Sequence, residues 1–327
     1  MIKKIFITGG GGYVGAELVP VLLKKGYNVT VLDLFIYGFN VLDDHPNLNK
    51  VKGDIRDSKL LKEILPSHDA VIHLACISND PSFELNPNLG KSINLDAFRP
   101  LVEFSIQYGI KRFIYASSSS VYGIKKDLNV HEGMNLEPLT DYSKFKADCE
   151  QILLEYNLSN FVPIIIRPAT VCGYSRRQRL DVVVNILTNL AYHKGEITVF
   201  GGNQLRPNIH IKDMVDLYVN LLNIDKNLVS RETFNAGYEN QKVIDIAESV
   251  RSVIGKNINI KIEETNDNRS YHISSAKIQK KLGFTALRSV KDAIIDLKAA
   301  FDNKLIINSM SDPLYFNIKT MQNLDLK

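Results

Sequence analysis

Cysteine is scarce in this chain, and its scarcity excludes two classes of protein. Cys76, Cys149 and Cys172 are far apart in the 327-residue sequence and lack the short spacings of a metal-binding motif. A small secreted domain held together by disulfide bonds would carry more cysteines than this. We therefore expect three reduced thiols, a cytoplasmic location and no metal site.

Long apolar runs and concentrated positive charge are also missing. No stretch has the length of a membrane-spanning helix, and the net charge of +4 is spread along the chain rather than gathered in a basic block. The first strand-like run begins at residue 2, which leaves no room for a signal peptide. The sequence therefore predicts that the chain binds neither a membrane nor nucleic acid. It also has no internal repeat and no low-complexity linker.

The first half of the chain alternates apolar, strand-like runs with helix-like segments. Strands are expected at 2–8, 28–33, 49–53, 70–74, 112–116 and 162–167, and helices at 12–25, 57–65, 91–108 and 141–157. This alternation predicts an α/β fold with a Rossmann-type, doubly wound parallel sheet covered by helices on both faces. In such sheets ligands bind beyond the carboxyl ends of the strands. Every notable polar cluster of this half lies at such an end.

The pattern becomes less regular beyond about residue 170. Helices are expected at 180–193, 212–223, 242–253, 274–281 and 288–302, with short strands near 197–200, 232–235 and 258–262. We interpret this half as a smaller C-terminal α/β substrate-binding lobe that is partly interleaved with the last strands of the sheet. The tail from about residue 304 has no clear assignment.

The first predicted strand runs directly into a glycine-rich loop that opens a helix. Gly9 permits the tight turn, Gly12 lets the backbone approach a pyrophosphate, and Gly15 allows the helix to pack closely. The helix N-terminus offers N–H groups and a positive dipole end to phosphates. Three spaced glycines alone are weak evidence, but their place between a strand and a helix predicts a dinucleotide site.

The second predicted strand ends at Asp33, which selects between the two nicotinamide dinucleotides. A carboxylate here accepts hydrogen bonds from both ribose hydroxyls of adenosine and repels a 2′-phosphate. Leu34 and Phe35 follow, with no Arg or Lys to bind that phosphate. The sequence favours NAD over NADP, and residues 1–170 are the expected NAD-binding domain, with residues 171–327 forming most of the substrate lobe.

A tyrosine and a lysine four residues apart carry the strongest catalytic signal. Tyr142 and Lys146 would share one face of a helix, so that both reach one reaction centre. A nearby cation favours the phenolate, and lowering a Tyr pKa from about 10 toward 7 takes roughly 4 kcal/mol. Lys146 and an oxidised nicotinamide ring together would supply it. A phenolate can then remove a hydroxyl proton. By itself this spacing is common by chance.

Four consecutive serines follow another predicted strand, at residues 117–120. A hydroxyl at this sheet end would hydrogen-bond the reacting oxygen near Tyr142. The alternative is a serine-rich turn that only caps neighbouring backbone groups.

At this point the chain resembles the extended short-chain dehydrogenase/reductase superfamily, in its NAD-dependent nucleotide-sugar epimerase/dehydratase family. The resemblance covers nearly the whole chain. It rests on segments in the family's order and spacing: TGGGGYVG (8–15), Asp33, GDIRD (53–57), HLAC (73–76), ASSSSVYG (116–123), YSKFK (142–146), RPATVCG (167–173), RPNIHIKD (206–213) and NRSYHISSAKIQKKLGF (268–284).

The resemblance implies roles for individual residues. It makes Tyr142 the general base, Lys146 its electrostatic partner and a ligand of the cofactor ribose, and Ser118 the third catalytic hydroxyl. Ser118 is chosen because it lies three residues before Val121-Tyr122-Gly123. Besides Tyr142 and Lys146, the implied NAD-binding residues are Gly9, Gly12, Tyr13, Val14, Gly15, Asp33, Asp54, Ile55, Leu74, Ala75, Cys76, Pro168 and Ala169. The implied substrate-binding residues are Ser118, Thr170, Arg179, Arg206 and Arg269.

Some of these assignments leave an alternative open. Arg206 and Arg269 resemble the arginines that grip the diphosphate of a sugar nucleotide, a role that suits the guanidinium fork. Surface ion pairs are the alternative for both. Arg176, Arg177 and Arg179 would add phosphate contacts, or they would form a charged helix start on the surface.

Two departures from the family's pattern are informative. Dehydratases of the family usually follow the catalytic hydroxyl with an Asp-Glu pair, where this chain has Ser119 and Ser120. The sequence therefore argues against dehydration. A frequent diphosphate-binding Asn is Thr170 here, and the segment 175–185 is more like a subgroup acting on sugars of bacterial surface polysaccharides.

Together these features predict NAD-dependent oxidation at C4 of a nucleotide-activated sugar, most plainly by a nucleotide-sugar 4-epimerase. The close alternative is a 4-dehydrogenase or reductase acting on a hexose or heptose, which releases or uses the 4-keto sugar. A non-enzymatic dinucleotide sensor is the third hypothesis. The base and sugar stay open. A homodimer is expected through helices 91–108 and 141–157, which carry surplus apolar residues such as Leu101, Phe104 and Ile106.

Overall fold

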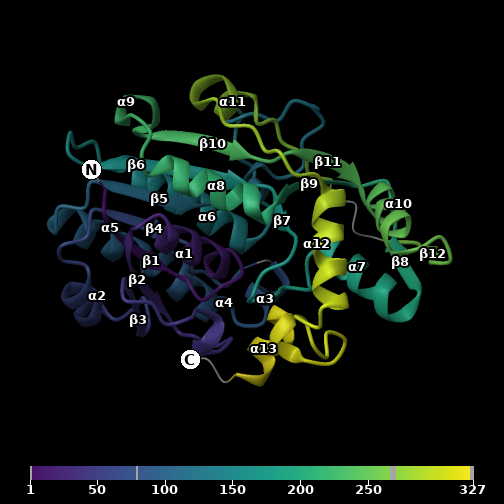
Figure 1. The fold of residues 1–327 in the computed structure, drawn as a ribbon. Helices are drawn as coiled ribbons and strands as arrows, with labels where there is room; N and C mark the ends of the chain where they lie inside the picture. Colours follow the sequence, from purple (N-terminus) through teal and green to yellow (C-terminus); the bar gives the residue numbers. More distant parts are fainter. Residues whose placement is uncertain (1, 79, 266–269, 325–327) are drawn as a thin grey trace.

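A seven-stranded parallel sheet forms the centre of the molecule (Figure 1). The computed structural model describes residues 2–78, 80–265 and 270–324. The strand order is β10-β6-β5-β4-β1-β2-β3. The strands are β1 (Lys4–Thr8), β2 (Asn28–Asp33), β3 (Leu48–Lys52), β4 (Ala70–His73), β5 (Arg112–Ala116), β6 (Val162–Pro168) and β10 (Glu232–Ala236). The predicted doubly wound α/β fold is confirmed.

Helices cover both faces of this sheet because its strands are apolar on both faces. In β1, Ile5 and Ile7 enter one core cluster and Phe6 enters the other, and all three are fully buried. The first cluster includes side chains of α1 (Gly15–Lys24) and α8 (Ile211–Leu221). The second includes side chains of α2 (Ser58–Ile64), α5 (Phe98–Gln107) and α6 (Asp141–Glu155).

The chain after β6 builds a smaller lobe and returns once to the central sheet. Its lobe contains a three-stranded and a two-stranded sheet, formed by β7 (Thr170–Cys172), β9 (Leu205–His210) and β11 (Glu239–Lys242), and by β8 (Glu196–Phe200) and β12 (Asn259–Glu263). Its helices are α7 (Val183–Lys194), α10 (Val243–Ile254) and α12 (Val290–Asp302), whereas α9 (Lys226–Val229) and α11 (Ala276–Leu282) pack beside β6 and β10 of the central sheet. The return is β10, which pairs in parallel with β6. The domain division at residue 170 stays a prediction.

The single helix expected at 91–108 is divided in the structure. A π-helix, η2 (Ser92–Asp96), follows α4 (Pro87–Lys91) and precedes α5. Within it, the Asn94 side chain accepts from the backbone N–H of Ile77 and donates to its carbonyl, each at 2.9 Å. These bonds fix the loop that follows β4. Single π turns of this kind frequently mark functional sites.

One detail of the dimer prediction is wrong. Leu101 was assigned to a surplus apolar surface, but it is fully buried within the chain's own core beside Phe98 and Val102. Phe104 and Ile106 are only partly buried against that core.

The C-terminal segment, for which the sequence gave no assignment, folds back onto the molecule. It contains a 3₁₀ turn, η4 (Pro313–Tyr315), and a final helix, α13 (Asn317–Asn323), near α3 (Asp80–Glu84). In Figure 1 the yellow end of the chain lies below α12, next to α3. Tyr315 and Phe316 pack on the small apolar cluster of Leu180 and Phe301. The segment is therefore part of the folded core.

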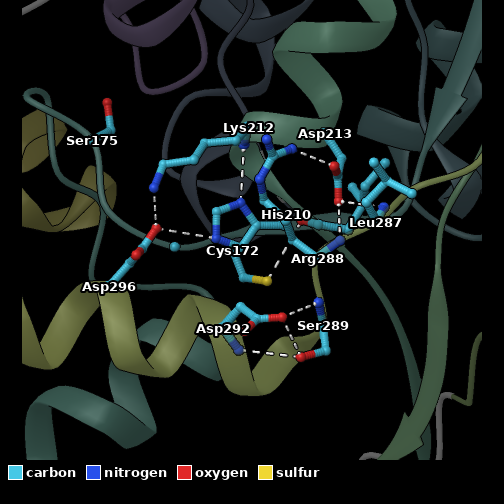
Figure 2. A network of polar contacts seen from close by, with 12 residues as sticks. Cys172, Ser175, His210, Lys212, Asp213, Leu287, Arg288, Ser289, Asp292 and Asp296 are labelled. Carbon is cyan, nitrogen blue, oxygen red and sulfur yellow. Dashed lines mark hydrogen bonds and ion pairs between the residues drawn. The ribbon is translucent and has the colours of Figure 1, made fainter.

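Polar contacts join α12 to the start of α8 (Figure 2). Asp296 on α12 accepts a 2.5 Å contact from the Lys212 ammonium and lies 3.3 Å from Nε2 of His210. The hydrogen bond with His210, followed by that with Lys212, lowers the pKa of Asp296 to about 2. Beside them, Arg288 forms an ion pair with the buried Asp213 at 2.5 Å. These contacts attach the smaller lobe to the helix that covers the sheet.

Candidate active site

A cavity of about 620 Å³ lies at the carboxyl ends of the parallel strands. All cofactor-binding residues named from the sequence line it: Gly9, Gly12, Tyr13, Val14, Gly15, Asp33, Asp54, Ile55, Leu74, Ala75, Cys76, Tyr142, Lys146, Pro168 and Ala169. Four of the five substrate-binding candidates line it too, namely Ser118, Thr170, Arg179 and Arg206. Arg269 lies outside the described residues. The structure thus brings these residues together, while their individual roles stay predictions.

The glycine loop has the close backbone contacts that only glycine allows. Gly9 has a φ of +74°, and a Cβ at this position would lie 2.5 Å from the backbone nitrogen of Ala75. At Gly12 a Cβ would meet only the Gly9 carbonyl oxygen, at 3.2 Å, so this position faces the cavity. Gly15 packs against the backbone of Gly10 rather than on the strand. The loop is shaped as a cradle at the N-terminus of α1.

Tyr13 contributes its backbone rather than its side chain to this cradle. Its hydroxyl donates to the Gly173 carbonyl at 2.6 Å and accepts from the Asn185 amide at 3.0 Å. The side chain therefore ties α1 to the lobe, and its burial raises the pKa of the hydroxyl. Backbone N–H groups at a helix start lack acceptors within the helix, so Tyr13 and Val14 offer them to a phosphate.

Asp33 is held by the backbone at the end of β2. Its two carboxylate oxygens accept from the N–H groups of Gly11 at 2.9 Å and Phe35 at 2.7 Å. Phe35 adopts a φ of +49°, which is unusual for a bulky residue, and its backbone N–H bonds to Asp33. Burial raises the pKa of Asp33, while the two backbone hydrogen bonds act to lower it. The carboxylate is fixed where the sequence predicted a ribose ligand.

The three proposed catalytic residues come from two elements that meet at the cavity. Tyr142 and Lys146 lie on α6, which Thr140 and Ser143 open with a capping box. The Lys146 ammonium donates to the Ala116 carbonyl at 2.6 Å and lies 5.9 Å from the Tyr142 ring centre. Ser118 follows β5 at the start of a 3₁₀ turn, η3 (Ser119–Tyr122), and its hydroxyl is close enough to Tyr142 to lower the pKa of the phenol.

The protein groups around Tyr142 have opposing effects on its acidity. Burial raises the pKa of the Tyr142 hydroxyl, and the neighbouring Cys76 and Asp80 raise it further. The Arg179 guanidinium and the hydrogen bond from Ser118 lower it. Arg179 therefore adds a cation at Tyr142 that the sequence had not assigned to acid–base chemistry. A positive nicotinamide would act in the same direction as Arg179.

A buried ion pair supports the serine turn through contacts with Tyr122 and Ser117. Glu150 and Arg167 form a 2.6 Å contact with side-chain exposures of 1% and 6%. Arg167 also donates to the Tyr122 hydroxyl at 2.8 Å, and Glu150 accepts from Ser117. Arg167 belongs to a recognised motif, but its partner Glu150 was missed. Its position, eight residues after Tyr142 on the same helix, was the available signal.

The serine turn itself answers one of the alternatives left by the sequence. Ser118 Oγ accepts from the Ser120 backbone N–H at 3.1 Å, so capping does occur. Ser118 also lines the cavity, where its side chain acts to lower the pKa of Tyr142. Ser118 therefore has both a structural contact and access to a ligand.

The three arginines of segment 175–185 are in different surroundings. Arg176 is exposed and pairs with Asp43 at 2.5 Å. Arg177 and Arg179 instead line the cavity, because α7 begins only at Val183. None of the three arginines therefore belongs to a charged helix start on the surface, because even the exposed Arg176 comes before α7 begins. Arg179 is kept in place by Asp181, at 2.6 Å.

The cavity has a further wall that the sequence did not reveal. Asn317 and Met321 of α13 line it, although they lie at the other end of the chain from the glycine loop. Asn317 is 5% exposed and accepts from Arg177 at 2.6 Å. No local pattern marks Asn317, because the partners of its side chain lie 140 or more residues away.

Two carboxylates of the cavity were also missed. Asp80 accepts a 2.6 Å hydrogen bond from Thr140, and Asp181 is engaged by Arg179. Neither follows Ser118 in the way that the dehydratase acid pair does. The cavity is thus not free of carboxylates, but those present have structural partners.

Comparisons with known proteins identify the family that the chain resembles. The model of the NAD dependent epimerase/dehydratase family matches residues 5–237. The UDP-glucose 4-epimerase of Lactobacillus helveticus is 27% identical over 76% of this chain and 82% of its own. The uncharacterized protein y4nG of Sinorhizobium fredii is 33% identical over 68% of this chain, and the match spans only 54% of that relative. The solved UDP-glucose 4-epimerase of Thermotoga maritima has a TM-score of 0.84, with 23% identity over 93% of this chain and all of its own.

The residues of the cavity fit NAD, the family's cofactor. The glycine cradle at α1 leaves room for a pyrophosphate, and Asp33 is oriented at the end of β2. Within the described part of the chain, the buried Nε of Arg177 has no hydrogen-bond partner. Such an orphaned donor is suited to an anionic ligand. Separately, none of the helices in residues 2–78, 80–265 and 270–324 is long and apolar enough to cross a membrane.

Proposed function

Because this chain belongs to the NAD dependent epimerase/dehydratase family, we propose that it is a nucleotide-sugar 4-epimerase. The observation that carries the proposal is the convergence of Ser118, Tyr142 and Lys146 at a cavity that also holds the glycine cradle and Asp33. This set suffices to oxidise a secondary alcohol reversibly. A 4-epimerase needs nothing more than that chemistry and a cofactor that stays bound.

The chain's own residues would act on the C4 hydroxyl of the sugar. Tyr142, as the phenolate, would take the hydroxyl proton, and Ser118 would hydrogen-bond the same oxygen. Lys146 and Arg179 would stabilise the negative charge on Tyr142. The bound cofactor supplies acceptance and return of a hydride. When the 4-keto sugar presents its other face, Tyr142 would give the proton back, and the inverted alcohol results.

The serine turn supports epimerisation over dehydration. Elimination of water across C5 and C6 needs an acid and a base beside the catalytic hydroxyl, and Ser119 and Ser120 are poor groups for both tasks. Asp80 and Asp181 also line the cavity, but they are engaged by Thr140 and Arg179. We therefore expect no 4-keto-6-deoxy product.

The test is a screen of UDP-, dTDP-, GDP- and CDP-sugars with the NAD-loaded protein in D₂O, read by proton NMR. An epimerase gives the C4-inverted sugar with no deuterium at C4, because the hydride returns directly. A dehydratase would give a 4-keto-6-deoxy sugar with deuterium from the solvent. Tyr142→Phe serves as the matched inactive control.

A 4-dehydrogenase is the second candidate, because it would use the same three residues. It is distinguished by stoichiometric 4-keto sugar together with accumulating NADH or a need for an external oxidant. That outcome would contradict the epimerase proposal but not the assignment of the site. A sensor without catalysis is opposed by the intact Ser118, Tyr142 and Lys146.

The proposal includes the biological setting and assembly. Segment 175–185 supports a role in making sugars for surface polysaccharides, in the cytoplasm. A homodimer would form through α5 and α6, which pack against each other and carry the partly buried Phe104 and Ile106. Light scattering on the purified protein tests the dimer, and Phe104→Glu should convert it to a monomer.

A further inference from the structure

Arg177 is a buried cation that forms no close ion pair within the described part of the chain, and the Asp33 and Asp181 carboxylates act on it only from farther away. It is 4% exposed, and its guanidinium lies 3.5 Å from the centre of the Tyr37 ring. One terminal nitrogen donates to the Asn317 side-chain oxygen at 2.6 Å. Its buried Nε has no hydrogen-bond partner among those residues. Arg179, two residues on, differs in having Asp181 as a partner.

Such a cation is costly unless an anion approaches it. A buried charge is normally paired, since desolvation penalises the charged form. Burial accordingly lowers the pKa of Arg177. A ring face and an amide oxygen offset only part of that cost. The site therefore suits a ligand that brings negative charge.

The position of Arg177 indicates which part of the cavity that ligand occupies. Two residues before it, Ser175 donates to the backbone carbonyl of Tyr13 at 2.8 Å, which fixes this loop against the glycine cradle. The Tyr37 ring that stacks on Arg177 lies four residues after Asp33, whose carboxylate interacts with the same guanidinium. Arg177 thus lies by the cradle and Asp33.

We propose that Arg177 binds a phosphate oxygen of the cofactor's pyrophosphate, and that Asn317 of the C-terminal segment holds Arg177 in that position. The cofactor is then gripped by two parts of the chain, the N-terminus of α1 and the Arg177 guanidinium. The fork of an arginine matches phosphate oxygens well. The cavity's other phosphate ligand would be the diphosphate of the sugar nucleotide. Arg206, beside Tyr271 on the lobe, is better placed for that group.

Asn317 can hold Arg177 in position because its hydrogen bonds connect the C-terminal segment with three other segments of the chain. Its side-chain oxygen accepts from Arg177 and from the Tyr37 hydroxyl at 3.0 Å, and its amide donates to Ser78 at 2.8 Å. Its backbone N–H donates to Asp181 at 3.0 Å. Loss of this side chain would free the Arg177 guanidinium without changing its charge. The C-terminal segment would in this way control how long the cofactor stays bound.

The experiment measures NAD⁺ binding to the full chain without nucleotide sugar, by calorimetry and by the rate at which bound NAD⁺ leaves. Arg177→Gln should weaken NAD⁺ binding at least tenfold and accelerate release. Arg176→Gln is the matched control, because it removes an adjacent positive charge that pairs with Asp43 on the surface. It should stay within twofold of the unchanged chain. Equal effects of the two substitutions, or none from Arg177→Gln, would overturn the proposal.

Two further arms separate the possible sources of phosphate. UDP is used as a probe of the substrate's diphosphate, and Arg177→Gln should leave its binding within twofold while Arg206→Gln weakens it. If Arg177→Gln lowered the affinity for UDP more than the affinity for NAD⁺, Arg177 would be assigned to the sugar nucleotide and the proposal would be overturned. NADP⁺ is the other probe. If Arg177→Gln lowered only the affinity for NADP⁺, the proposal would be overturned as well.

A second variant keeps the test decisive if Arg177→Gln does not fold. Asn317→Ala retains the charge of Arg177, and it should raise the release rate of NAD⁺ three- to tenfold with UDP binding unchanged. Circular dichroism and thermal melting without ligand show whether each variant is folded. A folded Asn317→Ala protein that releases NAD⁺ at the original rate would contradict the role of the C-terminal segment.

Discussion

The cavity has two walls that are built differently. The sheet wall consists of residues at the carboxyl ends of the parallel strands, including Gly9, Asp33 and Ser118, together with Tyr142 and Lys146 of α6. The outer wall consists of loop 173–182 and the C-terminal segment, with Arg177 and Asn317 at its centre. Residues of the sheet wall are positioned by strands that the backbone fixes in register. Residues of the outer wall depend on contacts between segments up to 280 residues apart.

This difference suggests two tasks, reaction with the sugar at the sheet wall and retention of the cofactor at the outer wall. The sheet wall carries the groups that would act on the sugar oxygen, whereas the outer wall carries cations, of which Arg179 alone acts on the acidity of Tyr142. Substitutions in the sheet wall should therefore change turnover, and substitutions in the outer wall should change how tightly the cofactor is held. The predictions below test this division, beginning with the largest effect.

Tyr142→Phe should break the chemistry of the sheet wall while leaving binding intact. Removal of the hydroxyl takes away the group that moves the proton, and we expect turnover to fall about 10³- to 10⁴-fold. NAD⁺ affinity should change less than threefold. Activity assays with calorimetry check both. Tyr156→Phe, at the far end of the same helix, is the control and should be fully active. Comparable activity in the two variants would remove Tyr142 from the mechanism.

Glu150→Gln should destabilise the support of the sheet wall. The substitution leaves Arg167 as a buried charge without its carboxylate, in a pair that is almost completely buried. Breaking such a pair costs about 3–5 kcal/mol of unfolding free energy. Urea unfolding measures the loss. Glu155→Gln, which breaks the exposed pair with Arg99, should have a much smaller effect because solvent screens that pair. Similar losses for the two variants would contradict this account.

His73→Gln should reduce the sensitivity of the fold to acid. His73 is fully buried against Thr8, and burial lowers its pKa to about 3. The unfolded chain binds a proton at His73 below about pH 6.5, whereas the folded chain does not until about pH 3. This contribution to stability is thus complete above pH 6.5 and is lost as the pH falls toward 3.

The measurement compares unfolding free energies at pH 7 and pH 5. The His73 contribution to the difference is about 2 kcal/mol, and His73→Gln should remove it. The exposed His45, replaced by Gln, serves as the control and should keep the original pH dependence. An unchanged pH dependence in His73→Gln would show that other groups cause it.

The two walls also differ in how far the sequence could predict them. Asp33 and the serines 117–120 were found because each lies at the end of an apolar run typical of a strand, and strand ends meet at one edge of a parallel sheet. Within that turn, Ser118 was chosen from the family resemblance. Arg177 was visible as a charge, but its burial was not, since it depends on where α7 begins and on the Tyr37 ring. Asn317 carried no signal, because its function comes entirely from tertiary contacts.

Local deviations from regular structure were equally hidden. Phe35 has a left-handed backbone conformation that an aromatic residue does not lead one to predict, and its N–H donates to Asp33. The π-helix at Ser92–Asp96 occupies a segment whose apolar pattern predicted one continuous helix. At the π-helix a tertiary contact with Ile77 competes with local preference, whereas at Phe35 the competing contact is the hydrogen bond to Asp33, two residues earlier.

Tyr37→Phe should give the smallest effect and bear most directly on the outer wall. It removes only the 3.0 Å hydrogen bond to Asn317 and keeps the ring on which Arg177 stacks. One neutral hydrogen bond contributes about 1 kcal/mol, so we expect NAD⁺ affinity to fall two- to fivefold with the turnover number unchanged. Tyr27→Phe, which loses a hydrogen bond with Asn223 on the surface, is the control and should bind NAD⁺ normally. A fall in turnover with unaltered NAD⁺ affinity would mean that the outer wall acts in the chemistry itself, and the division between the two walls would no longer hold.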